Sequence, residues 1–369
     1  MLLLATKVWE QRKLGEIGKI RSCKRIYRDQ TSSEGEIPFY KIGTFGKEAD
    51  SFIPQKLYKE YKEKFSFPKV GDILISASGT LGRTVVYNGE DAYFQDSNIV
   101  WLDNNNHLVL NNYLEIYYQR VHWKVSEGST IKRLYNSDIE RTIISIPKRN
   151  EQAKISECLK LLNKVIALYE KKKQLLTQLK QGIVNFLITK NEQKPQLRFS
   201  GFNNNWESKS FEKLLNYEQP IKYIVKKADY ISQGTPVLTA NKSFILGYTN
   251  ETNVYQNIPA IIFDDFTLES KYVDFPFMIK SSAIKILTSK NSNLFFIYQL
   301  LNNQRFVQEG HSRHYISVVQ KKKVLVPSIQ EQNKISDLIK QLEDNIELSS
   351  NTIVLLKKLK GFLLQNMFL

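Results

Sequence analysis

The apolar positions of this chain form a heptad pattern in two stretches, at about 145–188 and 325–368. In both stretches apolar residues recur at alternating steps of four and three, which predicts long helices that each pack against another helix. At about 1.5 Å of rise per residue, each helix would be roughly 60 Å long. The residues expected to pack between the helices are Ile155, Leu159, Leu162, Ile166 and Leu176 in the first stretch and Ile335, Ile339, Leu342, Ile346 and Leu356 in the second.

The two stretches are copies of one another. A constant offset of 180 residues, with no gap, pairs Pro147 with Pro327, the Glu-Gln at 151–152 with that at 331–332, and the Leu-Lys at 179–180 with that at 359–360. Unrelated amphipathic helices would share a period but not these polar identities, so the chain contains an internal repeat. The alternative is that the two stretches are ordinary amphipathic helices buried in one globule. If the helices instead pack on each other, an antiparallel pair would connect the chain without long return loops.

Each helical stretch follows a segment whose alternation and turn residues are typical of β-strands. In the first segment we expect strands at 37–42, 71–76, 84–87 and 97–102 and a helix at 112–121. The second segment repeats the order, with strands at 235–238, 258–263 and 282–285 and a helix at 294–298. The sequence therefore predicts an α+β protein with an internal pseudo-twofold repeat. Its two mixed α/β bodies, 1–144 and 206–327, are separated by a long antiparallel two-helix coiled coil, 145–190 and 328–369, with a linker at 191–205.

Composition and charge narrow the class of protein. The chain has 369 residues, of which 42% are apolar, so it can form real cores and is not a disordered chain. Its net charge of +16 points to nucleic acid or another anionic partner. Cys23 and Cys158 have no metal-binding or redox spacing and suit a reducing cytoplasm. Because no stretch approaches 18 apolar residues and the start is too short for a signal peptide, we expect no membrane association and a cytoplasmic location.

Several motifs recur at matching places in the two halves. Trp-Glu opens each body at 9–10 and 206–207, and Pro-Gln-Leu-Arg-Phe-Ser-Gly-Phe at 195–202 precedes the second body. The first body contains Gly-Asp-Ile-Leu-Ile-Ser-Ala-Ser-Gly-Thr-Leu-Gly-Arg at 71–83, and Pro-x-x-x-Glu-Gln precedes both helices. This combination resembles the DNA-specificity (S) subunit of type I restriction–modification systems, over nearly the whole chain. The second body departs from the pattern because it lacks the Gly-Asp-Ile-Leu strand and the Ser-Gly-Thr loop.

The resemblance implies a function and a set of partners. Each body would be a target-recognition domain that reads one half of a split double-stranded DNA sequence. The helices would act as a spacer and as the docking surface for two DNA methyltransferase (modification) subunits. The family's subunit has no catalytic activity of its own, and it directs adenine-N6 methylation and, with restriction (motor) subunits, ATP-dependent cleavage. S-adenosylmethionine, ATP and Mg²⁺ are thus expected on partner subunits in a bacterial, nucleoid-associated complex, and no cofactor is expected on this chain.

Polar and basic residues on the loops of both bodies are the candidates for DNA contacts. Lysines and arginines would neutralise phosphates, while loop side chains would read base edges in the major groove. Any one of these residues could instead be an ordinary turn or surface residue. The candidates in the first body are Lys41, Ser76, Ser78, Thr80, Arg83, Gln95, Ser97 and Asn98, with Lys19, Arg21, Lys24 and Arg25 as phosphate contacts. Those in the second body are Asn241, Lys242, Ser243, Arg313, His314 and Tyr315.

An enzymatic function is the other hypothesis that the sequence offers. Asp264-Asp265 followed by Glu269 and Lys271 is similar to the acidic Mg²⁺ site of many nucleases. The cramped spacing and the lack of a counterpart in the first half favour an acidic loop after a strand. No methyltransferase motif is present, the loop at 79–84 lacks the P-loop ending, and the four histidines have no metal spacing. We expect no catalytic residue and no metal site. A self-contained Mg²⁺-dependent nuclease and a coiled-coil protein-interaction scaffold stay as alternatives.

Overall fold

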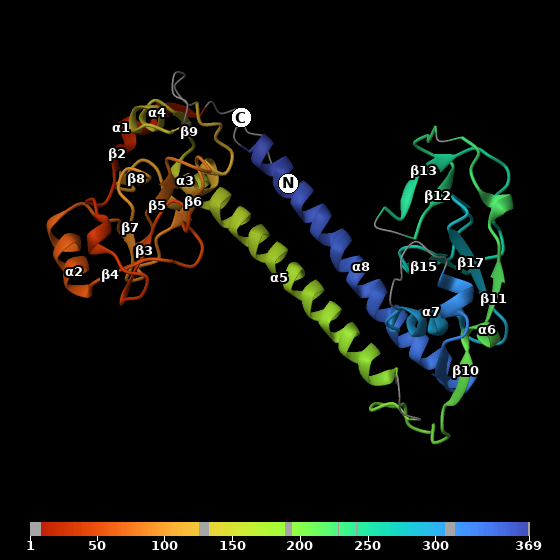
Figure 1. Ribbon diagram of the computed structural model, residues 1–369. Coiled ribbons are helices and arrows are strands. Elements are labelled where there is room, and N and C mark those ends of the chain that lie inside the picture. The colour runs from red at the N-terminus through yellow and green to blue at the C-terminus, as the bar shows by residue number, and fades with distance from the viewer. Residues whose placement is uncertain are drawn as a thin grey trace. The chain divides into compact units, whose positions relative to one another are not determined.

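The computed structural model describes residues 9–124, 133–188, 194–227, 229–240, 243–306 and 314–367 (Figure 1). The chain divides into two compact units, of which the first comprises Met1–Leu168 with Ile353–Leu369 and the second Tyr169–Thr352. Each unit contains one α+β body and a part of each long helix. Among the described residues, every helix is too polar or too short to cross a membrane.

Three small sheets build the body of the first unit. A four-stranded antiparallel sheet has the order β2-β8-β5-β6, a three-stranded sheet the order β4-β3-β7, and β1 pairs with β9. The strands are β1 (Glu10–Lys13), β2 (Gly18–Arg21), β3 (Ile37–Tyr40), β4 (Phe52–Ile53), β5 (Ile73–Ser76), β6 (Thr84–Val86), β7 (Tyr93–Phe94), β8 (Ile99–Asn104) and β9 (Ile143–Ile146). The helices are α1 (Leu14–Ile17), α2 (Gln55–Lys64), α3 (Asn111–Tyr118) and α4 (Asn136–Glu140), with a 3-10 turn at Arg28–Gln30.

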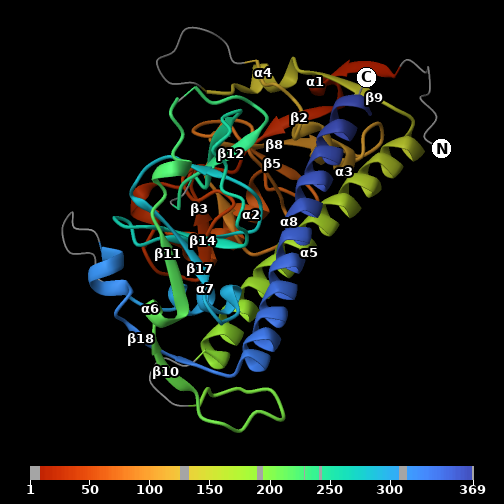
Figure 2. The same ribbon diagram turned by 90° about the vertical axis from the view of Figure 1, so that its right-hand side faces the viewer.

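The body of the second unit has the same topology. Its sheets are β11-β17-β14-β15, β13-β12-β16 and β10-β18, and β10 and β18 lie side by side (Figure 2). The strands are β10 (Glu207–Ser210), β11 (Leu215–Glu218), β12 (Thr235–Leu238), β13 (Ile245–Thr249), β14 (Ala260–Asp264), β15 (Ser270–Val273), β16 (Met278–Ile279), β17 (Ile284–Ser289) and β18 (Lys323–Val326). The helical segments are α6 (Phe211–Leu214), α7 (Leu294–Asn302), a 3-10 turn at Ile221–Tyr223 and a π-helical turn at Tyr315–Val319.

Strand register shows that the two bodies are structural repeats. Glu10 pairs with Ile146 in the first, and Glu207 with Val326 in the second, so the Trp-Glu motifs occupy the same place. In the central sheets Ile75 lies opposite Val100, as Phe263 lies opposite Lys285. The predicted α+β class and the internal repeat are therefore confirmed.

The long helices are α5 (Arg149–Leu187) and α8 (Ile329–Asn366). Both begin later than the heptad stretches, because the residues at 143–146 and 323–326 are the strands β9 and β18. A proline follows each strand before its helix begins. The sequence offset of 180 residues therefore covers a strand, a turn and a helix in each half, not a helix alone.

The packing of the helices within each unit is antiparallel. In the first unit Ile155 and Leu159, near the start of α5, join a core with Leu363 and Met367 near the end of α8. In the second unit the end of α5 packs in one core with the start of α8. That core includes Val184, Leu187, Ile335 and Ile339, and Lys180 forms an ion pair with Glu343. All ten residues expected in the seam are buried or half-buried.

A glutamine in each helix accounts for one polar identity of the repeat. The buried Gln152 amide donates to the carbonyls of Leu108 and Pro147, both at 2.9 Å, and accepts from Leu110 N at 2.8 Å. Gln332 likewise donates to the Pro327 carbonyl and accepts from Asn293 N, both at 2.9 Å. Each side chain thus ties the first turn of a long helix to the segment that precedes α3 or α7, and so fixes where the helix leaves its body.

Candidate nucleic-acid interface

Hydrogen bonds join the loops at the ends of β3, β5 and β7 in the first body. The side chain of Gln95 accepts from Ile42 N at 2.9 Å, and the Ser78 hydroxyl donates to Asn98 Oδ1 at 2.9 Å. Arg83 reaches the carbonyl of Gly46 at 3.2 Å. The structure therefore brings together most of the loop candidates, which come from three segments far apart in the sequence.

Ser76 is not available to a ligand. Its side chain is buried, its hydroxyl donates to the carbonyl of Thr80, and its oxygen accepts from Arg83 N at 2.8 Å. The expectation that Ser76 contacts DNA is corrected, because this hydroxyl holds the loop in shape from inside. Thr80 and Arg83 themselves are exposed on that loop.

Two glycines allow the same loop to turn. Gly79 and Gly82 have φ values of +64° and +74°, a left-handed conformation that glycine adopts without steric cost. At Gly82 a Cβ would lie 2.2 Å from Nε1 of Trp123, so the loop packs directly on the indole. The loop conformation therefore depends on the absence of a side chain at this position.

The candidate cations of the first body lie at its surface and have partners there. Exposed ion pairs contribute little to stability. These lysines and arginines can therefore leave their carboxylate partners and bind a DNA phosphate at a small cost in free energy. The partners are Asp103 for Arg21 at 3.8 Å, Asp96 for Arg25 at 3.0 Å, Asp50 for Lys41 at 2.8 Å, and the Phe65 ring for Lys24 at 5.1 Å. Lys19 is exposed on β2.

The second body places its candidates differently. Ser243 is exposed, and Asn241, Lys242 and Arg313 lie outside the described residues. His314 and Tyr315 are 3% and 0% exposed, so the expectation that they contact DNA is corrected. Nδ1 of His314 lies 3.2 Å from the carbonyl of Asp265, and Tyr315 N donates to that residue's carboxylate at 2.8 Å. Both residues therefore fasten the π-helical turn to the body.

The acidic residues considered for a nuclease site are bound to protein groups. Oδ1 of Asp264 accepts from Phe266 N at 2.8 Å and from Thr267 N at 3.0 Å, which closes a turn after β14. Asp265 forms a buried ion pair with Lys285 at 3.1 Å. No group of three His, Cys, Asp or Glu side chains suited to a metal occurs within the described ranges. These contacts favour the acidic turn over the nuclease interpretation.

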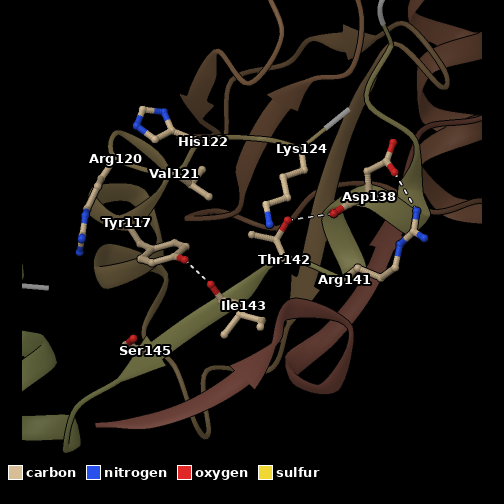
Figure 3. Close-up of a pocket in the computed structure, with 10 residues that line it drawn as sticks. All are labelled: Tyr117, Arg120, Val121, His122, Lys124, Asp138, Arg141, Thr142, Ile143 and Ser145. Carbon is tan, nitrogen blue, oxygen red and sulfur yellow. Dashed lines mark hydrogen bonds and ion pairs between the residues drawn. The ribbon is translucent and has the colours of Figure 1, made fainter. Parts of the chain in front are cut away.

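A cavity of about 650 Å³ lies between the end of α3, α4 and β9 (Figure 3). Its wall carries the cationic side chains of Arg120, Lys124 and Arg141, and Arg141 pairs with Asp138 at 2.9 Å. The Tyr117 hydroxyl donates to the Ile143 carbonyl, and burial raises the pKa of this phenol. None of these residues is predicted from the sequence, because isolated cations between a helix and a strand form no recognisable pattern.

Arg133 was also missed by the sequence analysis. Its guanidinium donates to the carbonyl of Ser97 at 2.8 Å, beside the loop candidates. The repeat gave a signal for it, since the same offset of 180 residues pairs Arg133 with the selected Arg313.

A second apolar stripe runs along the outer face of each long helix. Large apolar side chains recur there every seven residues and are more than half exposed. On α5 these are Leu161, Leu168 and Leu175, at 61%, 57% and 54% exposure, and on α8 Leu348, Leu355 and Phe362, at 62%, 65% and 60%. Heptad spacing on an exposed face is typical of a helix that packs on another helix.

Comparison with known proteins identifies the family. The family model described as the type I restriction modification DNA specificity domain matches twice, over residues 6–178 and 203–358. A putative type I restriction enzyme specificity subunit of Haemophilus influenzae is 58% identical over 142 residues, which are 38% of this chain and 37% of that relative. The EcoR124I/EcoR124II specificity subunit of Escherichia coli is 50% identical over 123 residues, 31% of this chain and 30% of that relative. The match thus spans about a third of either relative's length.

Solved structures share the fold. The S subunit of a type I restriction–modification system from M. genitalium has a TM-score of 0.64 and 16% identity, over 100% of this chain and 98% of its own. A chain from a structural study of assembly and conformational transition in the type I R-M system has a TM-score of 0.54 and 12% identity, over 98% and 97% of the two chains. Because the family model covers both halves, each with the same body and helix, this chain belongs to the type I restriction–modification DNA specificity family.

Proposed function

We propose that this chain is the sequence-reading subunit of a type I restriction–modification complex. Each α+β body reads one half of a split duplex target. The observation that carries the proposal is the duplication: two bodies of identical sheet topology in a chain of net charge +16 that belongs to a DNA specificity family. Repeated reading modules suit a target made of separated half-sites.

The reading surface of the first body is the set of joined loops that carries Ser78, Arg83 and Asn98. Their mutual hydrogen bonds limit the loops' freedom before DNA binds, which lowers the entropic cost of recognition. Asparagine is suited to bidentate contact with adenine, and arginine to contact with guanine. The exposed cations on β2 and after β3 supply salt-dependent affinity for the backbone.

Substitution of Asn98 tests this assignment. Asn98→Ala should relax discrimination at one base pair of one half-site by about 1–3 kcal/mol and leave the other half-site unaffected. Asn88→Ala, an exposed asparagine in the turn after β6, is the matched control. The measurement is selection of bound duplexes from a random library. Equal relaxation of both half-sites, or none, would show that these loops do not read bases.

The exposed apolar stripes on α5 and α8 are the proposed docking surface for two DNA methyltransferase subunits. Those partners, together with restriction and motor subunits, supply the catalysis and bind S-adenosylmethionine, ATP and Mg²⁺. In support, the stripes on α5 and α8 have the same spacing, and Leu168 and Leu348 are related by the repeat. Burial of a leucine side chain contributes about 1.5–3 kcal/mol, so a few suffice for a stable contact.

A charge on each stripe tests the docking surface. Leu168→Glu with Leu348→Glu should abolish co-purification of the methyltransferase, because a carboxylate would be buried at the contact. Gln178→Glu adds the same charge at an exposed polar position of α5 and should have no effect. Retained methyltransferase binding in the double variant would refute the docking surface while leaving DNA recognition intact.

The helix lengths are the proposed determinant of half-site spacing. Each long helix begins in one unit and ends in the other. Deleting one heptad from both helices removes about 10 Å of length. The gap between half-sites should then change or binding should be lost, with each body still folded, and an unchanged gap would contradict the spacing role.

A further inference from the structure

A second cavity of the first body, of about 440 Å³, adjoins the joined reading loops. Its base is apolar, formed by Val100 and Leu134, which are each 1% exposed. Its polar lining residues are Ser22, Ser97, Arg133, Tyr135, Asn136 and Ser137. These residues come from the end of β2, the turn before β8 and the segment that leads into α4, so the fold gathers them from three separate places.

The guanidinium of Arg133 is held in place in this cavity. It donates one hydrogen bond to the carbonyl of Ser97 at 2.8 Å. Ser97 has a φ of +52°, a left-handed conformation that is uncommon for a residue other than glycine. A guanidinium has five N–H donors in a planar fork, so it can keep this bond and still hold an anion with two parallel bonds.

The electrostatics of the cavity favour an anion. None of the eight described lining residues is acidic. The acids nearest along the chain are already paired, Asp96 with Arg25 at 3.0 Å and Asp138 with Arg141 at 2.9 Å. Serine and tyrosine hydroxyls, an asparagine amide and an arginine are the groups that contact DNA phosphates in general.

Two described positions of the second body differ from the first at the equivalent place. Strand register puts Lys285 where the first body has Val100, and Lys285 is buried against Asp265. Tyr315 holds the repeat position of Tyr135, but Tyr315 is 0% exposed and Tyr135 is 46% exposed. At these two described positions the second body therefore carries a larger or a more buried side chain than the first.

We infer that this cavity binds one backbone phosphate of the DNA duplex, with Arg133 as its principal ligand. The inference rests on the proposed function and adds to it a contact that fixes the register of the first body on its half-site. A phosphate contact carries no base information itself, but it positions the neighbouring loops against the base edges.

The test uses the full chain and duplexes that carry its selected target. Arg133→Gln should weaken binding on the order of tenfold, the effect of losing a charge-assisted hydrogen bond. The loss should be equal for cognate and mismatched duplexes, and the slope of log affinity against log salt should fall by about 0.9. Arg12→Gln, which removes an arginine that pairs with Glu10 on β1, is the matched control and should leave both quantities unchanged.

A scan with single methylphosphonate linkages locates the contact. One neutral linkage in the first half-site should weaken binding of the wild-type chain but not of Arg133→Gln. Arg133→Lys retains the charge, so it should keep the salt slope while losing part of the affinity. A change of base preference, or unchanged binding by Arg133→Gln, would overturn the phosphate assignment alone. If the wild-type chain bound no DNA, the proposed function would fail and this inference with it.

Discussion

The buried ion pair of the second body offers a quantitative test of how the two repeats differ. Asp265 and Lys285 are 1% and 3% exposed, and their charged groups are 3.1 Å apart. The first body has Ala77 and Val100 at the equivalent positions after and opposite the central strand. The variants to compare are therefore Asp265→Ala, Lys285→Val and the two combined. The double variant gives the second body the same two apolar residues that the first body has at these positions.

The magnitudes follow from what each change leaves unpaired. Removing one partner leaves an uncompensated buried charge, which costs about 3–5 kcal/mol. Asp265→Ala also removes the acceptor of Tyr315 N, a loss of about 1–3 kcal/mol. The double variant keeps that second loss and also loses the hydrogen bond that Lys285 Nζ donates to the Ser282 carbonyl at 2.9 Å, but it leaves no buried charge unpaired. It should therefore be more stable than either single variant, with a coupling energy of at least about 2 kcal/mol.

Hydrogen exchange read by mass spectrometry localises the effect. A loss of about 3 kcal/mol in the free energy of unfolding corresponds to a decrease of more than 100-fold in the protection of amides that exchange by unfolding of the body, since about 1.4 kcal/mol is tenfold. Peptides from β14 and β17 should lose protection in the single variants and recover most of it in the double variant. Peptides from β5 and β8 in the other unit serve as the control. Additive losses would refute the view that these residues act as a pair.

Three further predictions concern single positions. Burial raises the pKa of the Cys23 thiol to about 12. A thiol-reactive dye at pH 8 should therefore label only the exposed Cys158 until the chain is unfolded, and rapid labelling of both cysteines would contradict the burial of Cys23. Gly82→Ala places a methyl group against Trp123 in a left-handed conformation, and it should weaken DNA binding through the first half-site only, as measured by selection of bound duplexes. Arg198 in the linker donates two hydrogen bonds to the Glu331 carboxylate, both at 2.8 Å, so Glu331→Ala should destabilise the second unit by about 3–5 kcal/mol as measured by hydrogen exchange; an unchanged exchange rate would show that the pair is dispensable.

The long helices could be predicted from the sequence because their burial is periodic. Apolar residues at alternating steps of four and three, sustained over 38 or 39 residues, are buried together only when the segment is a helix that packs on another helix. The strands of the bodies were predicted where alternation and turn residues agreed, as at 73–76 and 84–86. The helix α2 was not predicted, since its apolar residues Leu57, Tyr58 and Tyr61 span little more than one turn of an otherwise polar segment.

The candidate site was less predictable, because a loop sequence does not show which side chains point inward. Ser76 ends β5 and Ser78 lies two positions later in the loop that follows, and only Ser78 is accessible. Asp265 stands where the first body has alanine. Its carbonyl lies beside Nδ1 of His314 and its carboxylate accepts from Tyr315 N, two contacts that no spacing indicates. Arg133 follows from the repeat, but its role depends on a backbone carbonyl that only the fold places beside it.

The proposed function requires that the two bodies read a split DNA target. The most direct measurement is a genome-wide map of methylated adenines in the host, made with and without this chain. We expect two short motifs separated by a fixed gap, both lost when the chain is deleted and restored when it is supplied again. A continuous motif, or a methylation map that does not change on deletion, would contradict it.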